Sequence, residues 1–227
     1  MLIRKYQTGD EKGWVYTKAL SYLFSPFFDD RETVKPPLNT DIYAHRIEWV
    51  AEIAGQVVGL LDIDIYNQEC SQSYRYAPAN KVAYFTNLAV HPDYQGQGIA
   101  QALYAKALGE LQEHQVEKLA IFTREGDVAN HLYQKWGGKL VCVDYLVIGQ
   151  PKDTPKVRFG VELDEGRLSL TDRAGQALPY YLREGIYIVA AQADLDLFDI
   201  RLSRIDIYSG YFAGVANILK KLSFGVE

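Results

Sequence analysis

Two glycines, Gly96 and Gly98, stand where the sequence changes from a strand pattern to a helix pattern. The preceding residues 83–90 (AYFTNLAV) are mostly apolar, aromatic or β-branched, and Pro92 then ends the strand because proline cannot donate to a sheet ladder. From Ile99 onward, apolar residues recur at helical spacing. The first turn of a helix has amide N–H groups without partners inside the helix, and glycines beside them leave room for a bulky anion. The pattern therefore predicts a phosphate or pyrophosphate site.

Glycine spacing alone leaves the ligand open. A glycine-containing turn that binds nothing fits the same spacing equally well. A dinucleotide-binding fingerprint requires a third glycine three residues after Gly98, where Gln101 stands, and it places its glycines directly after the strand. A P-loop requires a Gly-Lys-Ser/Thr ending, which this stretch lacks. The residues around the glycines must therefore indicate what binds.

Those surrounding residues resemble the acetyl-CoA motif of the GCN5-related N-acetyltransferases, the GNAT family. The family pattern Gln/Arg-x-x-Gly-x-Gly/Ala is present as QGQGIA, residues 95–100, after the lead-in LAVHPDY, residues 88–94. A second block, ANHLYQKWGG at residues 129–138, is similar to the family's A-x-x-L-Y-x-x-x-G-F helix. The two blocks stand in the family's order and spacing, and the resemblance covers roughly residues 1 to 148.

The resemblance implies a binding site for acetyl-CoA as the acetyl donor. The strand would hold the pantetheine arm and the acetyl group through its backbone at Leu88, Ala89 and Val90. The turn, which Gln95 opens, would bind the pyrophosphate through the backbone amides of Gly96, Gln97, Gly98, Ile99, Ala100 and Gln101. Tyr133 matches the tyrosine that the family uses as general acid toward the thiolate of coenzyme A. A tyrosine that only packs on a helix is the alternative interpretation.

The sequence departs from the family pattern at two places. An asparagine often stands seven residues before the tyrosine, but this chain has Gly126 there, and Asn130 is the expected substitute. The glutamate that serves as general base in some members would align near Tyr84, which is not a ready base. The base is therefore left open. The alternatives are Asp62, Asp64, Glu52 and His91, each of which is better explained as a structural or surface group.

The elements that position these residues indicate an α/β protein. The resemblance implies a GNAT-like mixed, mostly antiparallel central sheet flanked by helices. The predicted strands lie near residues 2–6, 46–53, 56–66, 83–90, 118–124 and 139–148, with helices that end near 23, start at 99, and span 127–136. Residues 1–150 are the predicted acetyltransferase domain. Residues 151–227 are a predicted small β-rich C-terminal extension that ends in an amphipathic helix over 211–222.

Composition limits the partners. The net charge of −5 argues against nucleic acid, which needs a basic surface, and no apolar run is long enough for a membrane span. The first residues lack the apolar run of a signal peptide, so we expect a cytoplasmic protein. The two cysteines, Cys70 and Cys142, have no nearby Cys/His spacing for zinc, and no metal is predicted. The terminal helix leaves a homodimer open.

The predicted function is acetyl-CoA-dependent N-acetyl transfer. The acceptor would be an amine of a small molecule, or else of a peptide or protein, that attacks the thioester directly in a ternary complex. A non-catalytic acyl-CoA-binding or sensor module on the same scaffold is the alternative, and a dinucleotide-binding domain is a more distant one. The identity of the acceptor cannot be read from these residues.

Overall fold

The chain forms two compact units. The computed structural model describes residues 1–28, 30–74, 79–124, 126–151, 157–164, 167–172, 177–183, 187–190 and 200–215. Unit 1 contains Met1–Phe122, Gly126–Lys139 and the segment that begins at Tyr211, whereas unit 2 contains Thr123–Glu125 and Leu140–Gly210. The domain boundary expected at residue 150 stays a prediction.

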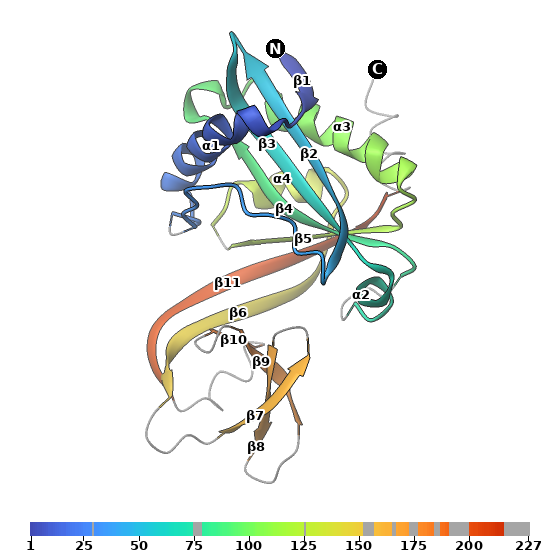
Figure 1. Cartoon of the computed structure of the whole chain (residues 1–227). Coiled ribbons are helices and arrows are strands. Elements are labelled where there is room, and N and C mark those ends of the chain that lie inside the picture. Colours follow the sequence, from blue (N-terminus) through green and yellow to red (C-terminus); the bar gives the residue numbers. More distant parts are fainter. Residues whose placement is uncertain are drawn as a thin grey trace. The chain divides into compact units, whose positions relative to one another are not determined.

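The sheet of unit 1 begins with four strands joined in antiparallel order (Figure 1). They are β1 (Leu2–Lys5), β2 (Tyr43–Ile53), β3 (Gln56–Tyr66) and β4 (Val82–Val90), and β5 (Lys118–Arg124) follows β4 in parallel. Ala54 and Gly55, which connect β2 to β3, have φ values of 52° and 78°. Positive φ at both residues is what a two-residue hairpin turn requires, and β2 and β3 accordingly form a tight hairpin. The predicted α/β class with a mostly antiparallel sheet is confirmed.

Two long helices cover the sheet of unit 1, and shorter elements connect the strands. In helix α1 (Glu11–Leu23), Trp14 packs against Val50 and Leu60. Helix α3 (Ile99–Glu113) packs against Leu61, the residue that follows Leu60 in β3. Neighbouring residues of a strand point to opposite faces, so the two helices cover opposite faces. The connecting elements are η1 (Thr8–Asp10), α2 (Gln68–Gln72), η2 (Pro92–Tyr94) and α4 (Ala129–Lys135). None of the described helices has the length and apolar character of a membrane span.

Gly59 allows the start of α3 to lie close to β3. A Cβ atom on Gly59 would stand 2.7 Å from Cγ2 of Ile99 and 3.2 Å from both Ala51 Cβ and Leu103 Cδ1. Any larger residue at position 59 would therefore displace the first turn of α3. This contact fixes where the glycine turn at residues 96–98 lies relative to the sheet.

A β-bulge interrupts β4 beside its partner strand β3. Asp62 pairs with Asn87, but the next residue of β3, Ile63, pairs with Phe85. Thr86 is the extra residue, and bulges of this kind bend a strand and redirect its side chains. The bulge lets Phe85 join the core on the α3 side, while Asn87 reaches Asp62 on the α1 side.

Unit 2 is built from strands. They are β6 (Lys139–Pro151), β7 (Val157–Asp164), β8 (Arg167–Asp172), β9 (Ala177–Arg183), β10 (Tyr187–Ala190) and most of β11 (Ile200–Gly214). The pairs β6–β10, β10–β9, β9–β8 and β8–β7 are all antiparallel. The β-rich character predicted for the C-terminal part of the chain is thus present.

The amphipathic helix predicted over residues 211–222 is wrong at its start, because its first four residues belong to β11. Tyr211 and Ala213 are buried, and as alternate residues of a strand they point to the same face of β11. Tyr211 and Val215 also fit the spacing of a helical stripe, which is why the sequence favours a helix here. Residues 216–222 lie outside the described residues.

Candidate functional site

The turn before α3 has the conformation that its glycines permit. Gly96 and Gly98 have φ values of 75° and 78°, a region in which side chains other than glycine are strained. A Cβ atom on either residue would meet nothing within 4 Å, so the space above the turn is open. No side chain caps α3, and among the described residues none accepts a hydrogen bond from the backbone N–H groups of residues 96–101. An anion placed there would face unpaired donors at the positive end of the helix dipole.

Strands β4 and β5 pair only at their beginnings. Their ladder runs from Val82↔Lys118 to Tyr84↔Ala120, although β4 continues to Val90 and β5 to Arg124. This separation is what the GNAT resemblance implies for the strands that hold the pantetheine arm. The described ladder ends at Tyr84, so the three β4 residues that were predicted to bind the arm lie in the part of β4 that does not pair with β5.

The backbone of β4 presents donors on the side away from β3. The N–H of His91 donates to the carbonyl of Val58 at 2.9 Å, so the polar backbone groups of His91 face β3. Because these groups alternate along a strand, those of Val90 and Leu88 face the opposite side, and those of Ala89 face β3. The Nε2 atom of Gln95 donates to the Val90 carbonyl at 3.1 Å and so joins the turn to this edge.

Tyr133 lies at the end of the β4–β5 ladder. It comes from α4, is 6% exposed, and packs edge-on against Phe85, with 5.7 Å between ring centroids. Burial raises the pKa of Tyr133 far above its ordinary value, and the carboxylate of Asp127 adds to the shift. Among the described residues none hydrogen-bonds to its hydroxyl. A neutral phenol in this position can donate a proton at pH 7.

The side chains of Asn130 and Gln101 are engaged within the protein. Asn130 accepts a hydrogen bond from the Tyr211 hydroxyl at 2.8 Å and donates to the Asp127 carbonyl at 3.0 Å. Gln101 accepts a hydrogen bond from Nε1 of Trp136 at 2.5 Å. The role predicted for Gln101 uses its backbone N–H, which this bond leaves available. The predicted contact of Asn130 with the pantetheine arm stays a prediction.

Three of the four alternatives for the general base are held in ion pairs. Asp62, which is 1% exposed, pairs with Lys35 at 2.6 Å, and Asp64 pairs with Arg46 at 2.6 Å. Glu52 pairs with Arg4 at 2.7 Å. The fourth alternative, His91, begins η2 and accepts a hydrogen bond from the Asp93 N–H through Nδ1. These contacts give each group a structural role, and the base stays unassigned.

Comparisons with known proteins identify the family. The family model described as the acetyltransferase (GNAT) family matches residues 17–138, more than half of the chain. The curated protein Acetyltransferase SG1711 of Sodalis glossinidius (strain morsitans) is 32% identical over 114 residues, which cover 50% of this chain and 69% of that protein. The chain therefore belongs to the GNAT acetyltransferase family, and the enzyme class predicted from the sequence is confirmed. Members of this family take the acetyl group from acetyl-CoA, which confirms the predicted donor.

Solved structures show the same fold. The tandem GNAT protein from the clavulanic acid biosynthesis pathway aligns with a TM-score of 0.54 at 13% identity, over 94% of this chain and 98% of that chain. An N-acetyltransferase from Staphylococcus aureus Mu50 aligns with a TM-score of 0.51 at 13% identity, over 94% of this chain and 98% of that chain. At this identity the likeness concerns the fold, and it confirms the predicted GNAT-like fold class.

Sequence reasoning missed several residues that shape the site. Gly59 sets the position of α3, Thr86 creates the bulge in β4, and Tyr211 holds Asn130 from a segment that was predicted to be helical. A glycine inside a strand pattern signals a close approach of another element, so Gly59 carried a readable signal. No signal in the sequence marks the bulge, and only the tertiary contacts identify the partner of Tyr211.

Proposed function

We propose that this protein transfers the acetyl group of acetyl-CoA to an amine acceptor, with both substrates bound at once. The observation that carries the proposal is the position of Tyr133. Its buried, neutral phenol packs against Phe85, the β4 residue that follows the end of the β4–β5 ladder. Further along the same strand, the N–H groups of Leu88 and Val90 face away from β3. A proton donor and backbone donors are the parts that thioester attack needs.

The pyrophosphate of the donor would lie on the turn at residues 96–101. The backbone N–H groups there have no acceptor among the described residues, and the space beside Gly96 and Gly98 is open, because both lack side chains. Several N–H groups that converge on one anion form a strong, directional site. The pantetheine arm would then run along the edge of β4 at Leu88, Ala89 and Val90.

The chemical step would be a direct attack. The neutral amine nitrogen forms a bond to the thioester carbonyl carbon, and the carbonyl oxygen gains negative charge that the N–H of Leu88 or Val90 would stabilise. As the carbon–sulfur bond breaks, the thiolate takes the proton of the Tyr133 hydroxyl. The phenol regains a proton from solvent, and the amine releases its own proton to a base that is not assigned. The acceptor is a small molecule or a peptide amine.

The test compares Tyr133→Phe with Tyr104→Phe. Both tyrosines are buried in the same cluster, but Tyr104 stacks on Trp136 with 3.8 Å between ring centroids and has no proposed part in the chemistry. Loss of a positioned general acid typically lowers kcat by about 10²–10⁴-fold. We expect this loss in Tyr133→Phe alone, with the calorimetric Kd for acetyl-CoA unchanged in both variants.

Two outcomes would contradict the proposal. Unchanged turnover in Tyr133→Phe would remove the role of the phenol. If the wild-type protein binds acetyl-CoA but acetylates none of a broad panel of amines, the chain is instead the non-catalytic acyl-CoA-binding module. Thermal-shift measurements with coenzyme A against NAD test the donor separately, because only a ligand that binds the native state raises the unfolding temperature.

A further inference from the structure

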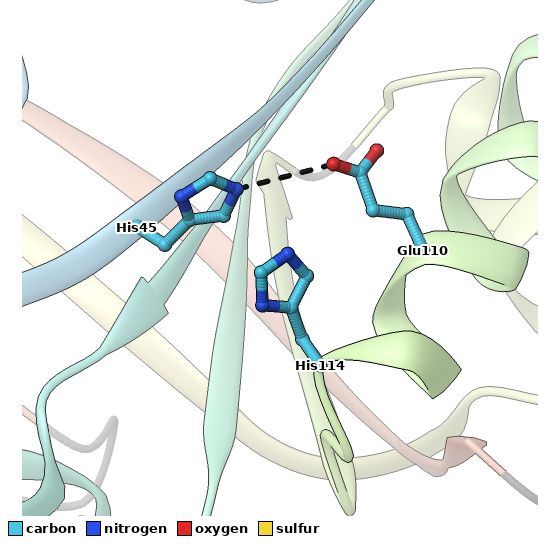
Figure 2. Close-up of side chains that lie close together, drawn as sticks. All are labelled: His45, Glu110 and His114. Carbon is cyan, nitrogen blue, oxygen red and sulfur yellow. Dashed lines mark ion pairs between the residues drawn. The ribbon is translucent and has the colours of Figure 1, made fainter.

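A group of three metal-ligand side chains lies on the α3 face of the sheet, apart from the acetyl-transfer site. His45 comes from β2, Glu110 lies in the last turn of α3, and His114 is the C-cap residue of the same helix (Figure 2). One ligand atom from each residue lies within 4.8 Å of the others. The α3 helix spans 15 residues, so at about 1.5 Å per residue this group lies about 20 Å from the glycine turn.

The backbone explains why these three side chains meet. Glu110 and His114 are four residues apart, so they lie one above the other on the same face of a helix. His45 shares its strand face with Ile47 and Trp49, which pack against the core under α3. The rings of His45 and His114 stack with 4.4 Å between centroids, and Nε2 of His45 is 3.9 Å from Oε1 of Glu110.

Glu110 is held in place by its other oxygen. Its Oε2 atom accepts hydrogen bonds from Nε1 of Trp49, at 2.8 Å, and from the ammonium of Lys5. A hydrogen bond of this kind orients a metal-binding carboxylate and leaves Oε1 directed toward the histidines. The Glu110 side chain is 12% exposed and His45 is 45% exposed, so the group is open to solvent on one side.

Both imidazoles are available as ligands. Among the described residues neither ring makes a hydrogen bond. A metal ion binds imidazole through a ring nitrogen, and in both rings this nitrogen is not engaged in a hydrogen bond with another described residue.

We propose that His45, Glu110 and His114 form a Zn²⁺ site. Two imidazoles and one carboxylate suit Zn²⁺, whereas Mg²⁺ and Ca²⁺ prefer oxygen ligands alone. The three protein ligands leave one position of a tetrahedron for water or for a further ligand. Ligand atoms in such a site lie about 3.3 Å apart, since zinc–ligand distances are about 2.0–2.2 Å. The ligand atoms, which now lie within 4.8 Å of one another, must move closer to bind the ion, and His45, at 45% exposure, has the most room to do so.

The bound ion would join α3 to β2 beyond the apolar core. Because the metal binds the folded arrangement, in which residues 45 and 110 meet, it adds binding free energy to the stability of the native state. The positive charge of Lys5 on Glu110 opposes the ion. The Lys5 side chain is 49% exposed, so it can leave Glu110 when the metal binds.

The experiment uses the full chain without a histidine tag. Isothermal titration with Zn²⁺ should give one site, addition of Zn²⁺ should raise the unfolding temperature, and EDTA should reverse the rise. His45→Ala and His114→Ala should each weaken Zn²⁺ binding by more than about 10-fold, a loss that already follows when only a supporting residue of a metal site is changed. His131→Ala is the matched control, because His131 is an exposed histidine on α4.

Further arms separate a built site from surface binding. Lys5→Gln should strengthen Zn²⁺ binding, because it removes the charge that competes for Glu110, and Mg²⁺ should not raise the unfolding temperature. Co²⁺ should give the intense visible absorption of a tetrahedral site in the wild-type protein and lose it in Glu110→Gln. The proposal is overturned if Zn²⁺ binding survives in both His45→Ala and His114→Ala, if His131→Ala weakens it equally, or if the wild-type protein does not bind.

Discussion

Replacing Gly59 by alanine tests how closely α3 is fitted to the sheet. The added Cβ would stand 2.7 Å from Cγ2 of Ile99, a distance at which one of the two groups must move. Ile99 cannot turn away, because a β-branched side chain in a helix has essentially one χ1 rotamer. It is 2% exposed and begins α3, so the displacement passes directly into the turn at Gly98.

The expected cost follows from the number of contacts involved. Overpacking of a filled core typically destabilises a protein by about 1–3 kcal/mol, and Ala51 and Leu103 leave little space at 3.2 Å each. Gly59→Ala should therefore lower the free energy of unfolding by about that amount and should weaken acetyl-CoA binding. Gly109→Ala is the matched control, because a Cβ on this helical glycine of α3 meets nothing within 4 Å. It should stabilise the protein by about 1 kcal/mol through helix propensity.

Denaturant unfolding followed by tryptophan fluorescence measures the free energy of unfolding of both variants, because Trp14, Trp49 and Trp136 all lie in unit 1. The double variant Gly59→Ala with Ile99→Ala removes the clashing group, so it should be more stable than the sum of the two single changes predicts. The reasoning is refuted if Gly59→Ala is neutral, or if the two changes simply add.

Two further predictions concern the site and its support. Gly98→Ala should weaken acetyl-CoA binding measured by calorimetry. A φ of 78° costs an alanine about 1–2 kcal/mol, and the added methyl group would enter the open space above the turn. Gly9→Ala is the control and should not weaken binding, because Gly9 has equally open surroundings but no positive φ. Lys35→Met should destabilise the protein by about 3 kcal/mol in denaturant unfolding, because it leaves the buried Asp62 carboxylate without its counter-ion. The Oδ1 atom of Asp62 already has no hydrogen-bond partner among the described residues. A loss below about 0.5 kcal/mol, as expected for the exposed control Lys106→Met, would contradict this.

Much of the fold could be predicted because the local signals were strong. The turn at Ala54 and Gly55, the start of α3 at Ile99 and the strand that ends before Pro92 each depend on residues close together in the sequence. The glycine turn was readable for the same reason, since backbone conformation at Gly96 and Gly98 is a local property.

Features that depend on distant residues could not be read in this way. The sequence gives no means of pairing Lys35 with Asp62, or Glu110 with Trp49, before the strands and helices are placed. The segment that starts at Tyr211 fits a helical stripe in the sequence, but residues 211–214 belong to β11, and the Tyr211 hydroxyl bonds to Asn130 of α4. The cysteines and their local spacing indicate no metal, because His45 is far in the sequence from Glu110 and His114, and only the packing of β2 against α3 brings the three together.

Helix α3 connects these observations, because it carries the glycine turn at one end and Glu110 with His114 at the other. Between the two ends its buried residues Leu103, Ala107, Leu108 and Leu111 pack into the core and are 0% exposed. Close-packed cores do not deform gradually, so a change at one end is transmitted only if the whole helix moves. Gly59 at one end and Trp49 with Glu110 at the other both oppose such a movement. The position of the predicted phosphate-binding turn is therefore set by how α3 packs on β2 and β3. Its glycines set only the local backbone conformation of the turn once α3 is in place.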